Sequence, residues 1–292
     1  MTRMPPLAGT NIVMSSPPKP VWALDSDTGS SQAWFTVERA LYLFAFIAGI
    51  ALRFGALAQK PLNSLEAWNA WAAWQKATGL TSPAEMTPVS PLWHSLQTWL
   101  FWTGVDGDGW ARSVAAAAGA LLILVPWGLR GLMGRPAALA LSVLIALDPW
   151  LVTLSRLADG AMLSAALALA LLAGAAWQLT NGRSVLVQRM MAVGAGLFLV
   201  SGPAAWSFLP PLVAFALMNR RALFRSAAGW REALLLFTVS AVAGATAGLT
   251  QLDGVGLVSR SLTVWRESVF AIGAPAATMP ASGGYPLGWP IT

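Results

Sequence analysis

The chain has 292 residues, of which 56% are hydrophobic and 10% charged, whereas about a quarter of the residues in a typical soluble domain are charged. Its mean hydropathy is +0.61. Cysteine is absent, which excludes disulfides, zinc–thiolate sites and thiol catalysis, and the single histidine argues against several imidazole-ligated cofactors. The net charge of +6 arises mainly from fifteen arginines. In a membrane protein such arginines belong to cytoplasmic loops, so the charge does not indicate nucleic acid.

The order of apolar and polar segments predicts an all-α protein, a polytopic transmembrane helix bundle with about seven spanning helices. A Pro/Ser-rich N-terminal tail is expected over residues 1–36, the bundle over 37–250 with an external loop at 58–109, and an external C-terminal segment over 251–292. The apolar runs lie at about 40–57, 110–129, 136–154, 160–179, 189–202, 204–218 and 232–250. Several are shorter than the ~20 residues that cross a bilayer, as is common inside a bundle.

Arginine placement predicts the topology. The loops near 130–135, 180–189 and 219–231 hold eight arginines between them. The positive-inside rule places all three loops in the cytoplasm, and therefore also the N-terminus. This count requires that Pro91–Trp102, with about 12 residues, does not cross the membrane and forms a surface or re-entrant helix instead. We expect an integral protein of the bacterial cytoplasmic membrane.

The external loop predicts an interfacial helix that begins at Leu65 with Ser64 as its N-cap. Trp68, Trp71 and Trp74 fall on one face of this helix, and Glu66 lies on the opposite face with Asn69 and Lys76. This pattern is typical of a helix that lies in the membrane interface with its rings in lipid. A simple anchoring helix and a polar face that lines a site are both open interpretations.

Four segments together resemble the GT-C glycosyltransferases, in particular the protein-mannosyltransferase-like and aminoarabinose-transferase-like branch. The resemblance covers about residues 37–270 by a diffuse pattern. It is carried by RFGALAQKPLNSLEAWNAWAAW, SPLWHSLQTWLFWTGVDGDGWARSVAAAAGALL, ALDPWLVTLSRLADGAML and GLFLVSGPAAWSFLPPL. It implies a donor of the polyprenyl-phosphate-sugar class, used at the outer membrane face with an optional divalent cation.

The resemblance assigns site residues unevenly. The family has an Asp–Glu pair in the first external loop, with the Asp as general base, but here Leu65 takes the place of the Asp and Glu66 alone remains. Arg112 matches the family's arginine at the end of that loop, which is placed to meet lipid phosphate. The family's Lys before the Pro-rich turn and its large C-terminal region have no counterpart here. Glu66 is therefore the candidate base and Arg112 the candidate phosphate ligand.

Several further residues are candidates with a plainer alternative. Arg156 and Asp159 are three residues apart and are expected to form a local ion pair, with lipid-phosphate binding by Arg156 and a donor-site role for Asp159 as the alternatives. His94, among tryptophans, is more often a hydrogen-bonded interface residue than a ligand. The sequence VDGDG, with Asp106 and Asp108, predicts a solvated turn, since the full calcium-loop pattern is missing. No metal site is predicted.

Two functions from different classes follow. The favoured one is a non-catalytic GT-C-like subunit that acts as a scaffold or stabilising component of a larger membrane complex. Its partners would be membrane lipids and other membrane protein subunits, with no nucleic acid and no cofactor. The alternative is a glycosyltransferase that uses Glu66 as base and Arg112 as phosphate clamp. A lipid carrier or transporter is a third interpretation, although the paired broken helices typical of transporters are not seen.

Overall fold

A computed structural model of the protein describes residues 36–80, 88–182, 184–220, 230–250, 252 and 254–270. The chain divides into a unit of Met1–Val37 and a unit of Glu38–Thr292, and the features below belong to the second. Apart from Thr36, the predicted N-terminal tail lies outside the described residues, as does the part of the predicted C-terminal segment beyond 270.

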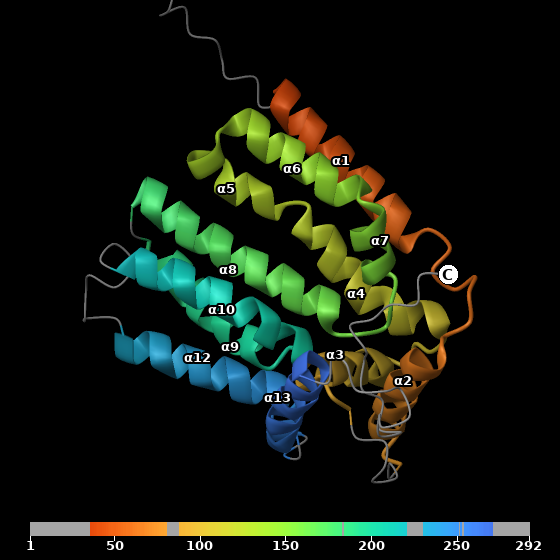
Figure 1. Ribbon diagram of the computed structural model, residues 1–292. Helices are drawn as coiled ribbons and strands as arrows, with labels where there is room; N and C mark the ends of the chain where they lie inside the picture. The colour runs from red at the N-terminus through yellow and green to blue at the C-terminus, as the bar shows by residue number, and fades with distance from the viewer. Residues whose placement is uncertain are drawn as a thin grey trace, which may run out of the picture. The chain divides into compact units, whose positions relative to one another are not determined.

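All regular structure in the described ranges is helical (Figure 1). The helices are α1 Val37–Phe54, α2 Ser64–Ala77, α3 Pro91–Trp102, α4 Asp108–Leu122, α5 Val125–Met133, α6 Arg135–Leu147, α7 Pro149–Ser155, α8 Ala161–Asn181, α9 Val185–Leu199, α10 Pro203–Met218, α12 Trp230–Ala245 and α13 Gly254–Phe270. The helix predicted over Pro91–Trp102 has those bounds. The all-α prediction is confirmed for the described residues.

The prediction of about seven spanning helices is wrong for this part of the chain. Two helices are long and apolar enough to cross a membrane: Asp108–Met133, which comprises α4 and α5, and Ala161–Asn181, which is α8. The pair α6 and α7 makes a third span only if its 58° bend is allowed within one crossing. The other predicted runs fail because α1 carries three charged residues in its 18, and because α9, α10 and α12 have only 15, 16 and 16 residues.

Proline causes the bend between α6 and α7. Pro149 has no backbone N–H and disfavours the helical conformation in the residue before it. Asp148 is accordingly extended, with φ −59° and ψ 118°, and its carboxylate accepts a 2.7 Å hydrogen bond from the backbone N–H of Leu151, so it caps α7. Arg53, fully buried in the last turn of α1, donates to the carbonyls of Ile145 at 2.7 Å and Ala146 at 3.1 Å. It thereby satisfies carbonyls that the break leaves without a helical partner.

The helix ends that flank the arginine-bearing loops lie together at one end of the bundle (Figure 1). The end of α5 meets the end of α8, where a Cβ on Gly131 would lie 2.9 Å from Thr180 Oγ1. Arg189 of α9 pairs with Glu232 of α12 at 2.7 Å. At the opposite end, the connection before α8 and the connection before α10 both approach Ser90, which precedes α3.

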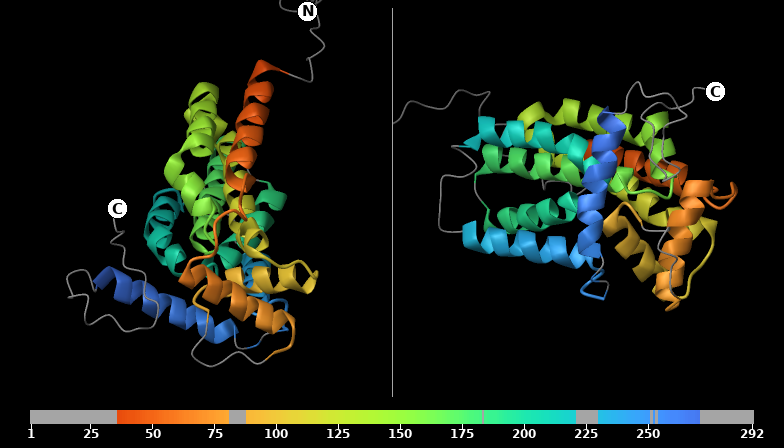
Figure 2. Two further views of the ribbon diagram at one scale, coloured as in Figure 1. Left: turned by 90° about the vertical axis from the view of Figure 1, so that its right-hand side faces the viewer. Right: turned by 60° about the horizontal axis from the view of Figure 1, so that its bottom comes forward.

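Two helices lie across the others at that opposite end. Figure 2 shows α13 lying across α10 and the end of α12, and it contacts both of these helices as well as α3. The indole N–H of Trp206 donates to Ser261 Oγ at 3.0 Å, and that of Trp265 donates to Ser207 Oγ at 2.9 Å, so two hydrogen bonds join α10 to α13. The other crossing helix, α2, packs on α3. It belongs to the predicted external loop and carries the candidate base.

Candidate functional site

The candidate site begins at the N-terminus of α2, which is capped by Asn63 and not by Ser64 as predicted. The Asn63 side chain accepts a hydrogen bond from the backbone N–H of Glu66, and the Glu66 carboxylate accepts one from the backbone N–H of Asn63, both at 2.9 Å. This is a capping box, in which each residue satisfies a free N–H of the first turn. The helix therefore starts one residue earlier than expected, and Glu66 is turned back toward its beginning.

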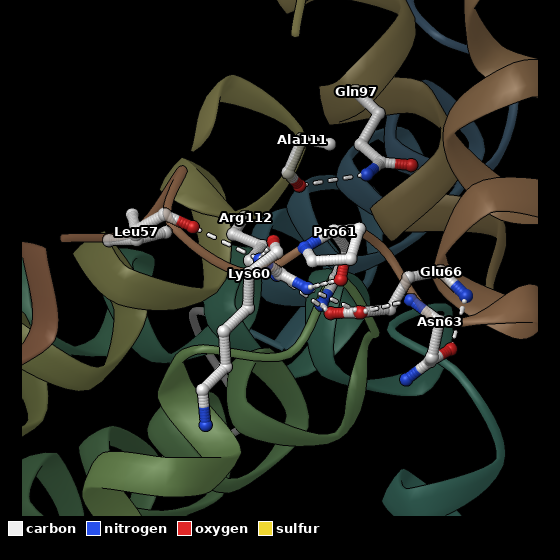
Figure 3. A network of polar contacts seen from close by, with 9 residues as sticks. Leu57, Lys60, Pro61, Asn63, Glu66, Gln97, Ala111 and Arg112 are labelled. Atoms are coloured by element: carbon white, nitrogen blue, oxygen red, sulfur yellow. Dashed lines mark hydrogen bonds and ion pairs between the residues drawn. The ribbon is translucent and has the colours of Figure 1, made fainter. Parts of the chain in front are cut away.

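Arg112, in the first turns of α4, forms a two-point ion pair with Glu66 (Figure 3). Its Nε donates to Glu66 Oε1 at 3.0 Å and its Nη2 to Glu66 Oε2 at 2.7 Å. The remaining N–H groups donate to backbone carbonyls of the α1–α2 connection: Nη1 to Leu57 at 3.0 Å and Lys60 at 2.7 Å, and Nη2 to Pro61 at 3.0 Å. A guanidinium has five N–H donors, so all five are used within the protein.

The Glu66 carboxylate is saturated in the same way. Oε1 accepts from Arg112 and from the backbone N–H of Ala158 at 2.8 Å, and Oε2 accepts from Arg112 and Asn63. These fill the four acceptor positions of a carboxylate. Burial alone would raise the pKa of Glu66, but hydrogen bonds from Arg112, Asn63 and Ala158 outweigh it and hold the pKa below its ordinary value. Glu66 is thus an ionised group with no free lone pair.

The pair joins three parts of the chain that are distant in sequence. Arg112 fixes α4 to the α1–α2 connection, while Ala158 brings in the connection between α7 and α8. The Lys60 side chain extends away from the pair, and only its carbonyl takes part (Figure 3). Gln97 of α3 donates to the Ala111 carbonyl at 3.0 Å and so ties α3 to the same turn of α4. The network is the polar centre of this end of the bundle.

Asp159 and Arg156 lie in the connection next to the pair but take other partners. The Asp159 carboxylate accepts a 2.8 Å hydrogen bond from the backbone N–H of Ala161 at the start of α8. Burial raises the pKa of Asp159 to about 6; the hydrogen bond from Ala161 lowers it and the negative charge of Glu66 raises it further. Arg156 donates to the Leu52 carbonyl at 3.0 Å and the Ala56 carbonyl at 3.3 Å. It therefore caps the end of α1, and the predicted ion pair between Arg156 and Asp159 is not formed.

His94 is buried in α3. Burial and, to a smaller extent, the charge of Lys76 lower its pKa to about 4, so the imidazole is neutral at pH 7. Its Nδ1 has no hydrogen-bond partner in the described part of the chain. No group of three or more His, Asp or Glu side chains among the described residues is placed to hold a metal ion.

The tryptophan face of α2 opens on a hollow of about 710 Å³ between α2, the end of α3 and the start of α4. Trp71 and Trp74 stack with ring centres 5.0 Å apart. The hollow is lined mainly by apolar side chains, with the carboxylates of Asp106 and Asp108 among its few polar groups. Neither Glu66 nor Arg112 is among the residues that line it.

Sequence reasoning did not find Asn63 or Ala158 as parts of the polar network, nor Arg53 as the residue that binds the carbonyls at the α6–α7 break. Arg53 ends an apolar run, where arginine is ordinary, and Ala158 contributes only a backbone N–H that no side-chain pattern reveals. For Asn63 a signal existed, since an Asn three residues before a Glu at a helix start predicts a capping box. The site therefore depends on backbone groups as much as on the predicted side chains.

No family model and no curated protein matches the chain. Among solved structures it is similar to the oligosaccharyltransferase of the archaeon Archaeoglobus fulgidus, crystallised in the apo form, with a TM-score of 0.54 and 15% sequence identity over 87% of this chain. The similarity is one of fold, to an enzyme of the GT-C type. The match covers 36% of the archaeal chain, so this chain spans a little over a third of that enzyme. At this identity the GT-C-like fold is what the comparison shows, and it supports membrane association together with the apolar helices.

Proposed function

We propose that this chain is a non-catalytic, GT-C-like integral membrane subunit that stabilises a larger membrane protein assembly. The observation that supports the proposal is the mutual saturation of Glu66 and Arg112. A general base needs a free lone pair within reach of the acceptor hydroxyl, and a phosphate ligand needs free N–H donors. Here both groups use all their hydrogen-bonding positions to join α2, α4 and the connection before α8.

The wider features of the chain agree with a supporting role. Because Leu65 stands at the position of the family's base, sugar transfer would need a carboxylate base from another part of the chain. The hollow beside α2 is open and mainly apolar, which suits contact with lipid or with a neighbouring subunit. We propose membrane lipids and other membrane subunits as partners, no cofactor, and a cytoplasmic N-terminus in a bacterial cytoplasmic membrane.

Asp159 is the observation that favours the alternative, a polyprenyl-phosphate-sugar glycosyltransferase. A base is most effective when its pKa is near the working pH, and the pKa of Asp159 is about 6. In the described part of the chain its carboxylate accepts one hydrogen bond, from Ala161, and so keeps acceptor positions there. In this alternative Asp159 would take the proton of the acceptor hydroxyl, and the Glu66–Arg112 pair would position the connection that carries it.

Purification separates the two functions. The full chain is expressed in its own host and extracted in a mild non-ionic detergent. Light scattering, corrected for bound detergent, then gives the molar mass of the particle. The scaffold proposal expects a particle that contains other membrane proteins in fixed ratio to this chain. A protein that leaves the membrane alone, in a monodisperse particle of one chain, would contradict it.

A further inference from the structure

The two helices that are long enough to span a membrane meet near their ends in a small hollow remote from the Glu66–Arg112 pair. The last turn of Asp108–Met133 and the last turn of Ala161–Asn181 enclose about 100 Å³. It is lined by Trp127, Gly128, Arg130, Gly131, Trp177 and Asn181. The ends of spanning helices lie at the membrane–water boundary, where indole side chains gather. The hollow is thus placed at headgroup depth.

The positive charge of Arg130 in this hollow has no counter-ion in the described part of the chain. Its guanidinium lies over the Trp127 ring, 4.2 Å from the ring centre. By contrast, Arg135 lies 3.9 Å from Glu38 and Arg189 lies 2.7 Å from Glu232. The N–H groups of Arg130 therefore remain available to a ligand.

The surrounding side chains are held in place by their own contacts. Tyr42 packs edge-on against the Trp127 ring at 4.9 Å. The Asn181 amide nitrogen donates to the Trp177 carbonyl at 3.3 Å and to Thr180 Oγ1 at 2.9 Å, which leaves its amide oxygen as an acceptor. The hollow thus offers one guanidinium with free donors, an aromatic wall and one free amide acceptor.

We infer that this hollow binds the phosphate group of an anionic phospholipid. The planar guanidinium matches the oxygens of a phosphate in a two-point contact, and basic pockets between membrane helices are sites for anionic headgroups. The volume equals about three waters at liquid density, enough for a phosphate group but not for a whole lipid. The acyl chains would lie outside, along exposed apolar side chains of the same helix such as Leu121 and Leu124. Inorganic phosphate shares the chemistry but lacks this apolar contact.

Native mass spectrometry of the delipidated full chain in a non-ionic detergent tests the inference. The protein is titrated with dioleoyl phosphatidylglycerol, with dioleoyl phosphatidylcholine and with inorganic phosphate. We expect one molecule of phosphatidylglycerol to bind with much higher affinity than either of the other two ligands. Arg130→Gln should lower the affinity for phosphatidylglycerol about tenfold, the factor that corresponds to one charge-assisted hydrogen bond. Arg130→Lys should fall between, because lysine keeps the charge but loses the two-point geometry.

Arg135→Gln is the matched control. It removes the same charge at a position five residues further along the chain, where the arginine lies 3.9 Å from Glu38. Phosphatidylglycerol affinity should be unchanged in it. Equal weakening by Arg130→Gln and Arg135→Gln would overturn the site in favour of general attraction to basic loops. Inorganic phosphate that binds as tightly as the lipid and displaces it would overturn the lipid assignment. Because Arg130 is exposed, the Arg130→Gln protein should unfold at the same temperature as the wild-type protein.

Discussion

Glu66 Oε1 accepts a 2.8 Å hydrogen bond from the backbone N–H of Ala158, 92 residues further along the chain. This bond connects the N-terminus of α2 to the connection before α8, and the same carboxylate carries the ion pair with Arg112. An acid that resembles a catalytic base by its position in the sequence is therefore a junction of the fold. The predictions below follow from this role and from the packing around it.

Glu66→Gln should destabilise the protein strongly. The amide NH₂ of glutamine would face an N–H group that now donates a hydrogen bond to Glu66. Arg112 would become a buried charge without its Glu66 counter-ion. Breaking a buried pair by removing one partner costs about 3–5 kcal/mol. The measurement is the free energy of unfolding from a dodecyl sulfate titration followed by circular dichroism.

Glu232→Gln is the control for that substitution, because Glu232 forms an ion pair of the same 2.7 Å length with Arg189 on the surface. Exposed pairs contribute less than about 1 kcal/mol. Glu66→Gln should therefore lower the free energy of unfolding several-fold more than Glu232→Gln does. If Glu66→Gln costs no more than Glu232→Gln, the junction role is wrong.

His94 should titrate far below an ordinary histidine, with a pKa of about 4 against 6.5, because burial disfavours the charged ring. Since the folded pKa lies below the unfolded one, the stability contribution is complete above pH 6.5 and is lost as the pH falls toward 4. His94 is the single histidine, so its ring protons in the NMR spectrum report the titration directly. A midpoint near 6.5 would mean that the imidazole is solvated.

Asp159→Asn should stabilise the protein at alkaline pH and not at acidic pH. The folded carboxyl keeps its proton up to about pH 6, against an ordinary value of 3.8, so ionisation costs stability as the pH rises through 6. Asparagine removes this cost and can still accept from Ala161. The gain at pH 8 should be about 1–2 kcal/mol, below what the full shift implies because the side chain is partly exposed. Thermal unfolding of both proteins at pH 8 and at pH 3.5 checks this prediction. An equal gain in stability at the two pH values would contradict it.

Gly196→Ala should destabilise the contact between α9 and α12. A Cβ on Gly196 would lie 2.3 Å from the Phe237 carbonyl oxygen, which is backbone and cannot turn aside. Overpacking of this kind costs about 1–3 kcal/mol. Gly256→Ala in α13 is the control, because a Cβ there meets nothing within 4 Å, and alanine is the better helix former by about 1 kcal/mol. The midpoint of thermal unfolding should fall in Gly196→Ala and rise in Gly256→Ala.

Composition and apolar periodicity were enough to predict the helical class, because a chain this poor in charge has few other ways to satisfy its backbone in a membrane. They overcounted the spans, because apolarity alone registers neither the bend that Pro149 causes between α6 and α7 nor how short α9 and α10 are. The side chains of the polar site, Glu66 and Arg112, were found in the sequence. Their roles were not, because these depend on the carbonyls of Leu57, Lys60 and Pro61 and on the N–H of Ala158, which only the folded chain brings together.

The most direct test of the non-catalytic role is the rate at which the purified full chain releases polyprenyl phosphate from a polyprenyl-phosphate sugar, with the wild-type protein, Glu66→Gln and Asp159→Asn compared at pH 7. General-base help contributes typically about 10²–10⁴ in rate. Our account predicts that all three proteins release product no faster than a sample without protein. Release by the wild-type chain that falls a hundredfold or more in Asp159→Asn or in a folded Glu66→Gln protein would contradict it and establish a glycosyltransferase.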